Sequence, residues 1–377
     1  MELDRFIHGI KKEMGTGLEK LSDGIKKIKE PAQPPKMTLS VCMLGPRGVG
    51  KTSVITSMYN SQKEAVSGSN LFLIAEGDTK MILDDKKNQL IHTFQGLHDE
   101  RSLVKESGIP GDFSESLFCF TYGMNSERVN IDLEIRDYPG EYLKREPQIV
   151  ADYIREASAV MIAIDTPCMM EAGGRYNDGK NTPQLVMDFL MENLKNEEEK
   201  LILFVPLKCE KYFQENRIDE VTKRVQENYA GLIEYLRDRE NTRGFKKMVC
   251  CAITPIQTLG GVAFDSFEKD PGGTIAEFTA RDGRVLPARI FYHYISADAV
   301  YSPKYCVQPL YYLLSFVSKQ YQRMQNQEKV SGWFGKLREA LRLIPNVDAF
   351  MMEIASMGIQ RIDGTQGYKI LFGRGRI

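Results

Sequence analysis

Residues 45–52 read Gly-Pro-Arg-Gly-Val-Gly-Lys-Thr and match the phosphate-binding pattern GxxxxGK[ST]. An apolar, strand-like segment over 37–44 precedes this loop, and a helical pattern begins near Ser53. Glycines let the backbone turn tightly and aim its N–H groups at phosphate oxygens, and the following helix adds the positive end of its dipole. Because a strand, a loop and a helix follow one another as the motif requires, the sequence predicts a P-loop.

The residue types of the loop suggest a role for several positions. Lys51 is expected to reach the β- and γ-phosphates and to act in catalysis, and the Thr52 hydroxyl is expected to coordinate Mg²⁺. The residues of this segment predicted to bind a nucleotide are Gly45, Arg47, Gly48, Val49, Gly50, Lys51, Thr52 and Ser53.

A second element, Asp-Tyr-Pro-Gly-Glu at 137–141, follows a strand expected over 131–135. Asp137 stands at the strand tip, where a carboxylate can hold Mg²⁺, usually through water. The N–H group of Gly140 can sense a γ-phosphate, and the segment can move when that phosphate leaves. Such a DxxG is also compatible with a plain Pro-Gly turn, but its place one strand after a P-loop favours a switch element.

A third element, Leu-Lys-Cys-Glu at 207–210, follows the strand expected over 201–205. Proteins that bind guanine nucleotides usually carry [NT]KxD at this place. The stem of Lys208 can cover the base, and Glu210 offers the same two acceptor oxygens as Asp on a longer arm. Leu207 cannot replace the Asn, and a solvated helix start is the alternative interpretation.

Together these residues resemble the Ras-like, translation-factor-related class of P-loop GTPases, over roughly residues 41–312. Within that class the chain is similar to the prokaryotic double-GTPase group, on four phrases: DYPGE at 137–141, PLKCEKY at 206–212, TPIQTLGG at 254–261 and YSPKYCVQPL at 301–310. The resemblance implies GTP or GDP and Mg²⁺ as ligands. It also implies a second GTPase or an effector protein as partner, in a prokaryotic signalling or defence system.

Two residues depart from the usual pattern of this class. Glu141 stands where Ras-like switches commonly have the Gln that orients the attacking water, and it can accept a hydrogen bond from water but adds negative charge near the γ-phosphate. Arg47 stands where small Ras-like enzymes favour Gly, and it is a candidate built-in arginine finger. The alternatives are that Glu141 starts a surface helix and that Arg47 only attracts phosphate.

Strand and helix patterns alternate after the loop. Strands are expected over 118–122, 129–135, 160–164, 201–205 and 248–253, and helical stretches over 184–196, 219–239 and 309–324. The first two strands are expected to pair in antiparallel fashion. This alternation predicts an α/β fold, specifically a P-loop nucleoside triphosphatase three-layer sandwich with a mostly parallel sheet and one antiparallel strand, plus an N-terminal helical arm.

The sequence divides into four parts: an amphipathic helical arm over 1–30, a Pro-rich linker over 31–36, the P-loop GTPase domain over 37–325, and a basic helical tail over 326–377. About 60–115 is an insertion relative to a minimal domain, with a strand over 70–75 and a helix near 80–96. The Gly/Asn/Asp-rich loop over 173–182 is predicted to be mobile. In the tail we expect a helix over 347–357 and a short strand near 368–372.

The arm places apolar residues three and four positions apart, with lysines on its other face. Packing on a partner or on its own domain is favoured over peripheral contact with a membrane, because bulky aromatic residues are nearly absent from its apolar face. Pairing as a coiled coil, and therefore a homo-oligomer, is also compatible with this spacing. Residues 1–37 carry eight Lys/Arg against six Asp/Glu, and residues 326–377 carry eight against five, so both ends are basic candidate contact surfaces.

Composition and charge exclude several classes of protein. The chain has 377 residues, of which 42% are hydrophobic and 27% charged, as in a globular protein and unlike a disordered one. Its net charge of −1 argues against a whole-chain nucleic-acid binder. No apolar run approaches the ~18 residues of a membrane-spanning helix.

The N-terminus and the cysteines indicate a cytoplasmic location. Asp4 and Lys11 stand where a secretion signal would need an apolar stretch. The seven cysteines include no CxxC spacing, so buried thiols in a reducing compartment are expected rather than a zinc or redox site.

Three functions are compatible with these motifs. The favoured one is a switch that binds and hydrolyses GTP and works with a partner GTPase. A non-catalytic nucleotide-binding scaffold is the second, because Glu replaces the water-orienting Gln. An ATP-specific P-loop protein is the third, because Leu207 and Glu210 match the guanine code imperfectly.

Overall fold

The computed structural model describes residues 37–66, 70–96, 116–125, 129–194, 199–241, 249–280, 282–326, 347–357 and 369–373. The predicted arm over 1–30 and the linker over 31–36 lie outside these residues and belong to a separate unit, Met1–Lys36. The second unit, Met37–Ile377, contains all of the described helices and strands.

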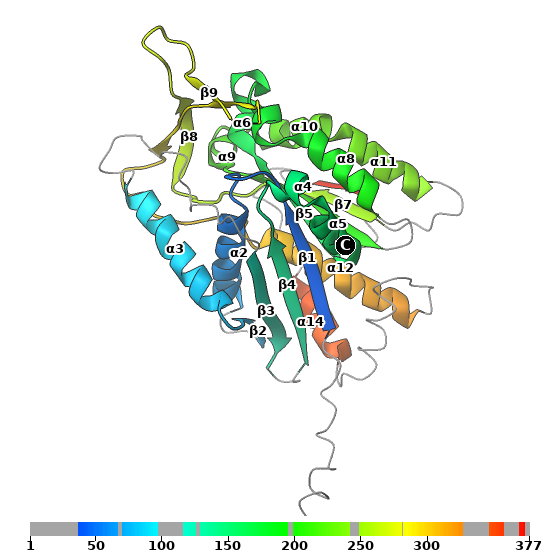
Figure 1. Ribbon diagram of the computed structural model, residues 1–377. Coiled ribbons are helices and arrows are strands. Elements are labelled where there is room, and N and C mark those ends of the chain that lie inside the picture. The colour runs from blue at the N-terminus through cyan, green and yellow to red at the C-terminus, as the bar shows by residue number, and fades with distance from the viewer. Residues whose placement is uncertain are drawn as a thin grey trace, which may run out of the picture. The chain divides into compact units, whose positions relative to one another are not determined.

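An eight-stranded sheet forms the centre of this unit, in the order β12-β7-β6-β5-β1-β4-β3-β2 (Figure 1). The strands are β1 (Met37–Leu44), β2 (Leu71–Ala75), β3 (Ser116–Met124), β4 (Val129–Asp137), β5 (Ala159–Asp165), β6 (Lys200–Leu207), β7 (Val249–Ile253) and β12 (Lys369–Phe372). Strands β4, β1, β5, β6 and β7 are parallel. The α/β class and the mostly parallel sheet of a P-loop nucleoside triphosphatase are therefore confirmed.

The sequence predicted one antiparallel strand, and the described sheet contains two that run against the parallel set. The expected one is β3, which pairs in antiparallel fashion with both β4 and β2. The additional one is β12, which pairs with β7 at the far edge. The four-residue strand β12 is too short for a period-2 pattern to reveal its direction.

Helices cover both faces of the sheet, because successive strand residues point to opposite faces. In β1, Leu39, Val41 and Met43 join one core, and Cys42 and Leu44 join the other. The first core lies beneath α2 (Lys51–Ala65), α12 (Gln308–Gln325) and α14 (Val347–Met357), with α3 (Thr79–Gly96) packed beside α2. The second lies beneath α5 (Pro147–Glu156), α8 (Pro183–Asn193), α10 (Ile218–Asn228) and α11 (Ala230–Asn241).

Two features of the helical layers differ from the sequence analysis. The stretch over 219–239 was expected to be one helical segment but forms α10 and α11, because Tyr229 leaves the helical conformation and its ring packs on Phe204 at 5.0 Å. The boundary at 325/326 does not divide the structure. Phe350 of α14 is buried in the main core, and the Ser318 hydroxyl donates to the Met351 carbonyl at 3.1 Å.

The loop over 173–182, which was predicted to be mobile, is built into the core at Tyr176, Asn177 and 179–181, which are buried, whereas Gly173, Arg175 and Asp178 are exposed. It contains the 3₁₀ turn η1 (Glu171–Gly174) and the short helix α7 (Asn177–Lys180), both after α6 (Thr166–Met170). Tyr176 is fully buried, and the Asn181 side chain bonds both backbone groups of Asp165, at 2.7 and 3.1 Å. The composition of this segment is typical of a loop, but its polar side chains form hydrogen bonds with buried backbone groups. These hydrogen bonds hold the segment in a defined conformation.

Two antiparallel two-stranded sheets between β7 and α12 were not predicted. They comprise β8 (Val262–Phe267) with β11 (Ile290–Tyr294), and β9 (Glu277–Thr279) with β10 (Val285–Pro287). A third, smaller core beneath them includes Phe264, Phe267 and Tyr176. The β8–β11 pair contains a register shift between Phe291 and Tyr292, which interrupts the alternation that a sequence pattern could detect.

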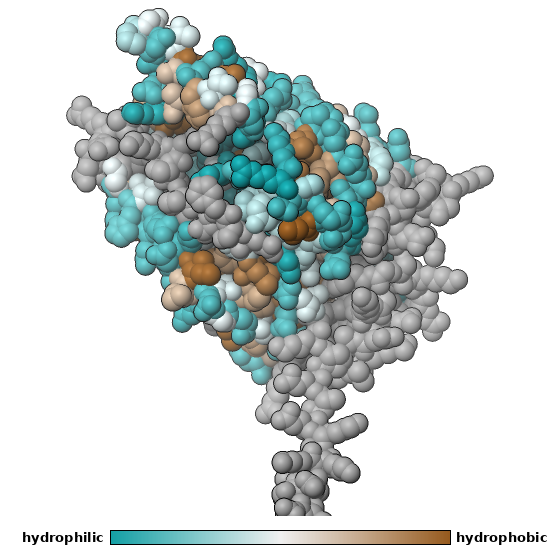
Figure 2. Space-filling view, in the orientation of Figure 1, coloured by the Kyte–Doolittle hydropathy of each residue, from teal (hydrophilic) through white to brown (hydrophobic). Residues whose placement is uncertain are grey.

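The described surface is mostly hydrophilic on the face shown in Figure 2, where hydrophobic residues form separate small patches. Within the described ranges, no helix is long and apolar enough to cross a membrane. None of the seven cysteines, all of which lie within the described ranges, forms a disulfide; six are buried and Cys119 is half-buried, as expected for thiols that pack as small apolar groups.

Candidate functional site

The P-loop leaves the carboxyl end of β1 and enters α2. Gly45 and Gly50 have φ values of 139° and 110°, which side chains rarely adopt. A Cβ atom on Gly45 would lie 2.9 Å from the Ala163 carbonyl oxygen of β5, so the loop turns in close contact with the neighbouring strand. Gly50 directly precedes α2 and starts it in the left-handed conformation. The predicted strand–loop–helix context is confirmed.

Lys51 lies across the loop with its side chain buried. Its ammonium group donates to the carbonyl oxygens of Gly45 and Pro46, at 3.0 and 3.3 Å, and lies 3.7 Å from Asp137 Oδ1. Two backbone acceptors and one carboxylate thus hold a cation at the centre of the loop. Val49 and Ser53 are also buried, so their side chains support the loop from within.

Thr52, in the first turn of α2, and Asp137, the last residue of β4, come together at the carboxyl end of the sheet. The Thr52 hydroxyl donates to Asp137 Oδ2 at 2.5 Å, and Asp137 pairs in register with Met43 near the end of β1. A hydroxyl and a carboxylate are oxygen donors of the kind that Mg²⁺ prefers, and Mg²⁺ fills most of its octahedron with water and phosphate oxygens. Two protein oxygens at this point therefore fit that ion. Within the described ranges, no group of three or more His, Cys, Asp or Glu could hold a metal.

The DYPGE segment lies directly on the P-loop. Tyr138 is buried and packs on Tyr153 of α5 at 6.0 Å, which anchors the segment from one side. A Cβ atom on Gly140 would lie 2.4 Å from the Arg47 nitrogen and 2.6 Å from the Pro46 carbonyl carbon. No side chain fits at Gly140, so backbone packs on backbone between the two motifs.

Gly140→Ala is expected to lift the DYPGE segment off the loop, because the atoms that its methyl group would meet are backbone. Under the GTPase function that the sequence predicts, we expect hydrolysis of GTP to slow by about tenfold, equivalent to about 1.4 kcal/mol in the barrier, while GDP affinity changes little. Gly231→Ala is the matched control, since a Cβ there would meet only Met187 Sδ at an ordinary 3.8 Å. Unchanged hydrolysis in Gly140→Ala would show that the contact is not required.

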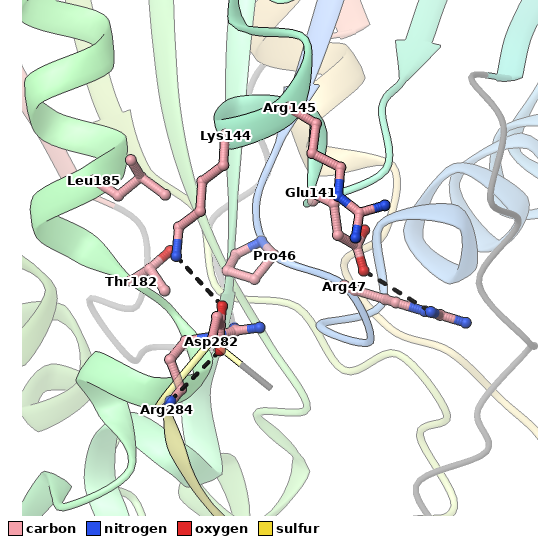
Figure 3. Close-up of a pocket in the computed structure, with 10 residues that line it drawn as sticks. Pro46, Arg47, Glu141, Lys144, Arg145, Thr182, Leu185, Asp282 and Arg284 are labelled. Atoms are coloured by element: carbon pink, nitrogen blue, oxygen red, sulfur yellow. Dashed lines mark hydrogen bonds and ion pairs between the residues drawn. The ribbon is translucent and has the colours of Figure 1, made fainter. Parts of the chain in front are cut away.

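Arg47 and Glu141 face one another across the edge of a pocket of about 140 Å³ (Figure 3). Arg47 Nη1 lies 3.8 Å from Glu141 Oε1, and the two side chains are 43% and 36% exposed. An ion pair this long and this exposed is weak. The residues that line the pocket are Pro46, Arg47, Gly140, Glu141, Lys144, Arg145, Thr182, Leu185, Asp282 and Arg284.

The far wall of this pocket comes from the turn between β9 and β10. Asp282 accepts hydrogen bonds from Arg284 Nε at 2.8 Å and from Lys144 Nζ at 3.3 Å, and Lys144 belongs to α4 (Tyr142–Arg145) after the DYPGE segment. The hydrogen bonds from Arg284 lower the pKa of the Asp282 carboxyl to about 2. The sequence analysis identified neither Asp282 nor Arg284, because the hairpin that carries them was not predicted.

Lys208 and Glu210 lie at the end of β6, where they were expected, but both are bonded within the chain. Lys208 Nζ lies 2.6 Å from Oδ2 of the fully buried Asp165. Burial alone would raise the pKa of the Asp165 carboxyl, but the ammonium groups of Lys208 and Lys180 hold it below its usual value. Glu210 Oε1 accepts from the backbone N–H groups of Leu259 and Gly260, at 2.8 and 3.1 Å.

The contacts of Glu210 indicate a structural role, whereas the sequence analysis predicted only that Glu210 would contact the guanine base. Its carboxylate ties α9 (Glu210–Gln214) to the loop after β7. Burial raises the pKa of this carboxyl. Leu207, which stands in place of the usual Asn, contacts the P-loop instead, with Cδ1 3.4 Å from the Cβ position of Gly50.

Glu210→Ala is expected to lower the free energy of unfolding by about 2 kcal/mol or more, because the half-buried N–H group of Leu259 and the buried N–H group of Gly260 lose their acceptor. Glu210→Gln keeps a carbonyl oxygen for those groups and is expected to cost less than about 1 kcal/mol. Chemical unfolding of both variants measures these losses. If Glu210 also reads a guanine base, Glu210→Gln reduces the preference for GDP over ADP; Glu210→Ala with wild-type stability would refute the structural role.

Comparisons of the sequence with protein-family models and with curated proteins find no match. Among solved structures, the chain is similar to the S. cerevisiae Ski7 GTPase-like domain bound to GTP, at 12% identity over 62% of this chain and 45% of that chain, with a TM-score of 0.37. It is also similar to the bacterial dynamin GTPase LeoA from ETEC, at 15% identity over 64% and 32%, with a TM-score of 0.27. The match thus spans less than half the length of either protein.

The sheet order, the loop after β1 and the acidic residue at the end of β4 define the class of this domain on their own. They are those of an α/β P-loop nucleoside triphosphatase fold.

Proposed function

We propose that this chain binds GTP and GDP together with Mg²⁺, hydrolyses GTP, and uses the resulting change of its DYPGE segment as a molecular switch. The observation that carries the proposal is the backbone contact of Gly140 with Pro46 and Arg47. A segment that rests on the phosphate-binding loop is sensitive to whether a γ-phosphate occupies the space beside it.

In this proposal, the P-loop N–H groups and Lys51 bind the phosphate chain. Lys51 exchanges its two carbonyl acceptors for phosphate oxygens, which are stronger acceptors for an ammonium group. Thr52 and Asp137 would hold Mg²⁺, which when bound neutralises charge on the β- and γ-phosphates. Gly140 donates its N–H to the γ-phosphate side of the site.

Hydrolysis requires water to attack the γ-phosphorus while the bond to the β–γ bridging oxygen breaks, which releases phosphate and leaves GDP. Glu141 accepts a hydrogen bond from that water, and Arg47 turns from Glu141 toward the charge that develops on the phosphoryl oxygens. Their separation of 3.8 Å and high exposure support this exchange, because a weak ion pair is released at little cost.

The preference for guanine over adenine nucleotides has a competing explanation. Lys208 and Glu210 would contact the base, but Glu210 is already bonded to Leu259 and Gly260, and Leu207 supplies no amide. These contacts favour an ATP-binding P-loop protein as the second candidate. The third, a nucleotide-binding scaffold without turnover, differs from the proposal only in its hydrolysis rate.

We further propose a protein partner, either a second GTPase of the double-GTPase kind in a prokaryotic signalling or defence system or another effector. The support is the resemblance of the DYPGE and PLKCEKY phrases and the basic character of both ends of the chain. A second copy of this chain could take the place of that partner, as a homo-oligomer. Contact of the N-terminal arm with a membrane is the less favoured alternative.

One purified sample tests the main proposal. Nucleotide extracted from the protein is identified by chromatography, and GDP and ADP then compete for the emptied site. Preference for GDP, with phosphate release in a single turnover of GTP, supports the switch. Preference for ADP supports the second candidate, and guanine binding without phosphate release, even with a partner GTPase present, supports the scaffold.

A further inference from the structure

A largely buried ion pair lies at the carboxyl ends of β5 and β6, close to the P-loop. Asp165 is the last residue of β5 and is fully buried, and Lys208 directly follows β6. Lys208 Nζ lies 2.6 Å from Asp165 Oδ2, and the Lys208 side chain is 21% exposed. Strand β5 is the direct neighbour of β1, and α/β sheets bind their ligands beyond the carboxyl ends of the strands. The pair therefore stands where a nucleotide on the P-loop would extend.

The backbone of Lys208 has a conformation that lysine rarely adopts. Its φ is 60°, in the left-handed region, where a non-glycine residue persists only if its surroundings hold it. On one side, Leu207 pairs in register with Asp165; on the other, the Cys209 N–H donates to the Ile256 carbonyl at 3.1 Å. These contacts fix the backbone on both sides of Lys208, and the ion pair fixes the far end of its side chain.

Asp165 is held by contacts that do not involve Lys208. Its Oδ1 accepts from the Cys168 N–H at 3.0 Å, and its backbone N–H and carbonyl are bonded by the Asn181 side chain at 2.7 and 3.1 Å. The carboxylate thus offers Lys208 an acceptor in a fixed position. The four-carbon stem of Lys208 must then cross from the end of β6 to the end of the neighbouring strand β5.

We propose that Asp165 is a positioning residue for the nucleotide base: by binding Lys208 Nζ, it holds the lysine stem across this edge as an apolar surface on which the base packs. This inference rests on the nucleotide-binding function proposed above, in which Lys208 contacts the base. It adds a residue that none of the three sequence motifs contains. Stability alone is a poor explanation for the pair, because buried ion pairs gain little over apolar residues of similar volume.

Two lysines then contact different parts of the nucleotide. Lys51 Nζ lies in the P-loop, bonded to backbone carbonyls that phosphate oxygens can replace. Lys208 has its ammonium group bound to Asp165, so it presents methylene groups to a ligand rather than a positive charge. Loss of the Asp165 carboxylate should therefore weaken contact with the base and leave contact with the phosphates in place.

The test compares Asp165→Asn with Glu199→Gln in the full chain. Glu199 is a matched control because it is also a buried carboxylate bonded to a cation, Arg323 Nη1 at 2.7 Å, but it directly precedes β6 at the opposite, amino end of that strand. We expect Asp165→Asn to weaken GDP binding by about tenfold. Its affinity for pyrophosphate, which has no base, should change by less than about threefold. Calorimetry measures both, with pyrophosphate as a competitor of GDP.

A double-mutant cycle with Lys208→Gly shows whether Asp165 acts through the lysine. Lys180 also places positive charge near this carboxylate, so the single variant alone does not isolate the part that passes through Lys208. Glycine removes the stem and adopts the left-handed backbone without strain. We expect Lys208→Gly to weaken GDP binding by about tenfold, and the double variant to bind GDP no more weakly than Lys208→Gly.

Glu199→Gln should lower thermal stability but leave both affinities of the folded protein unchanged. If Asp165→Asn does not fold, Asp165→Ser, which keeps an oxygen acceptor for the Cys168 N–H at the start of α6, is measured in its place with the same expectation.

Four results would overturn the positioning role and leave the nucleotide function standing: GDP affinity within about threefold of wild type in the Asp165 variant, equal losses of GDP and pyrophosphate affinity, an equal loss in Glu199→Gln, or losses that add in the double variant. Methylene groups do not distinguish purines, so ADP replaces GDP in the same comparison if the wild type prefers it. Wild-type protein that binds neither GDP nor ADP overturns both proposals.

Discussion

Lys51→Met is expected to weaken binding of GDP and GTP by at least about 100-fold, which corresponds to about 2.7 kcal/mol. The physical reason is the loss of charge-assisted hydrogen bonds between an ammonium group and phosphate, each worth about 1.5–3 kcal/mol. The side chain also spans the loop, with its Nζ at 3.0 Å from the Gly45 carbonyl oxygen. Its removal therefore also weakens the contacts that hold the P-loop backbone in place. Titration with a fluorescent GDP analogue measures the loss.

The variant also leaves Asp137 without the ammonium group that lies 3.7 Å away in the wild type. Thermal unfolding without nucleotide therefore accompanies the titration. Lys200→Met controls for the removal of a buried lysine, because Lys200 lies at the opposite, amino end of β6 and its Nζ donates to the carbonyls of Arg155 and Ala157. GDP binding at wild-type strength by a folded Lys51→Met protein would place the nucleotide away from the P-loop and reject the proposed site.

Arg47→Ala is expected to slow single-turnover GTP hydrolysis by about 10³-fold, the lower end of what an arginine finger supplies. GDP affinity should change little, because the guanidinium group is 43% exposed and its ion pair with Glu141 is long. Quenched-flow measurement of phosphate release at saturating GTP, together with GDP titration, separates these two effects.

Arg145→Ala is the matched control for Arg47→Ala. Arg145 lines the same pocket, is exposed, and belongs to α4 rather than to the P-loop. An equal loss of rate in both variants would indicate general attraction of phosphate by the positive charges of this pocket. Turnover by Arg47→Ala at the wild-type rate would refute the arginine finger outright.

Many of the helices and strands could be predicted from local residue patterns in the sequence. The strand over 37–44 and the helix after Lys51 were predicted close to the bounds of β1 and α2, because buried parallel strands are continuous apolar runs and the P-loop glycines punctuate them. The antiparallel pair β3–β4 and the tail elements α14 and β12 were also anticipated as elements. The direction of β12 and its place in the sheet were not indicated by the sequence.

The candidate site divides in the same way. The motifs predicted that Lys51, Thr52 and Asp137 share one site, and the structure brings the three side chains together because β1 and β4, the strands before the P-loop and the DxxG segment, are parallel neighbours in the sheet. Glu210 could not be understood from its motif, since its two donors lie about 50 positions further along the chain.

The sequence by itself therefore determined the strand, the glycine-rich loop and the helix of the P-loop pattern, and it predicted which residues bind phosphate and which segment responds to a γ-phosphate. Only the tertiary structure decided that Lys180 lies against Gly48, that Gly140 rests on Pro46 and Arg47, and that β12 of the tail pairs with β7 at the edge of the sheet. The physical reason is how far apart in the sequence the interacting residues lie. Backbone turns and helix starts depend on neighbours within a few residues, whereas the surroundings of a buried charge depend on segments that only packing brings together.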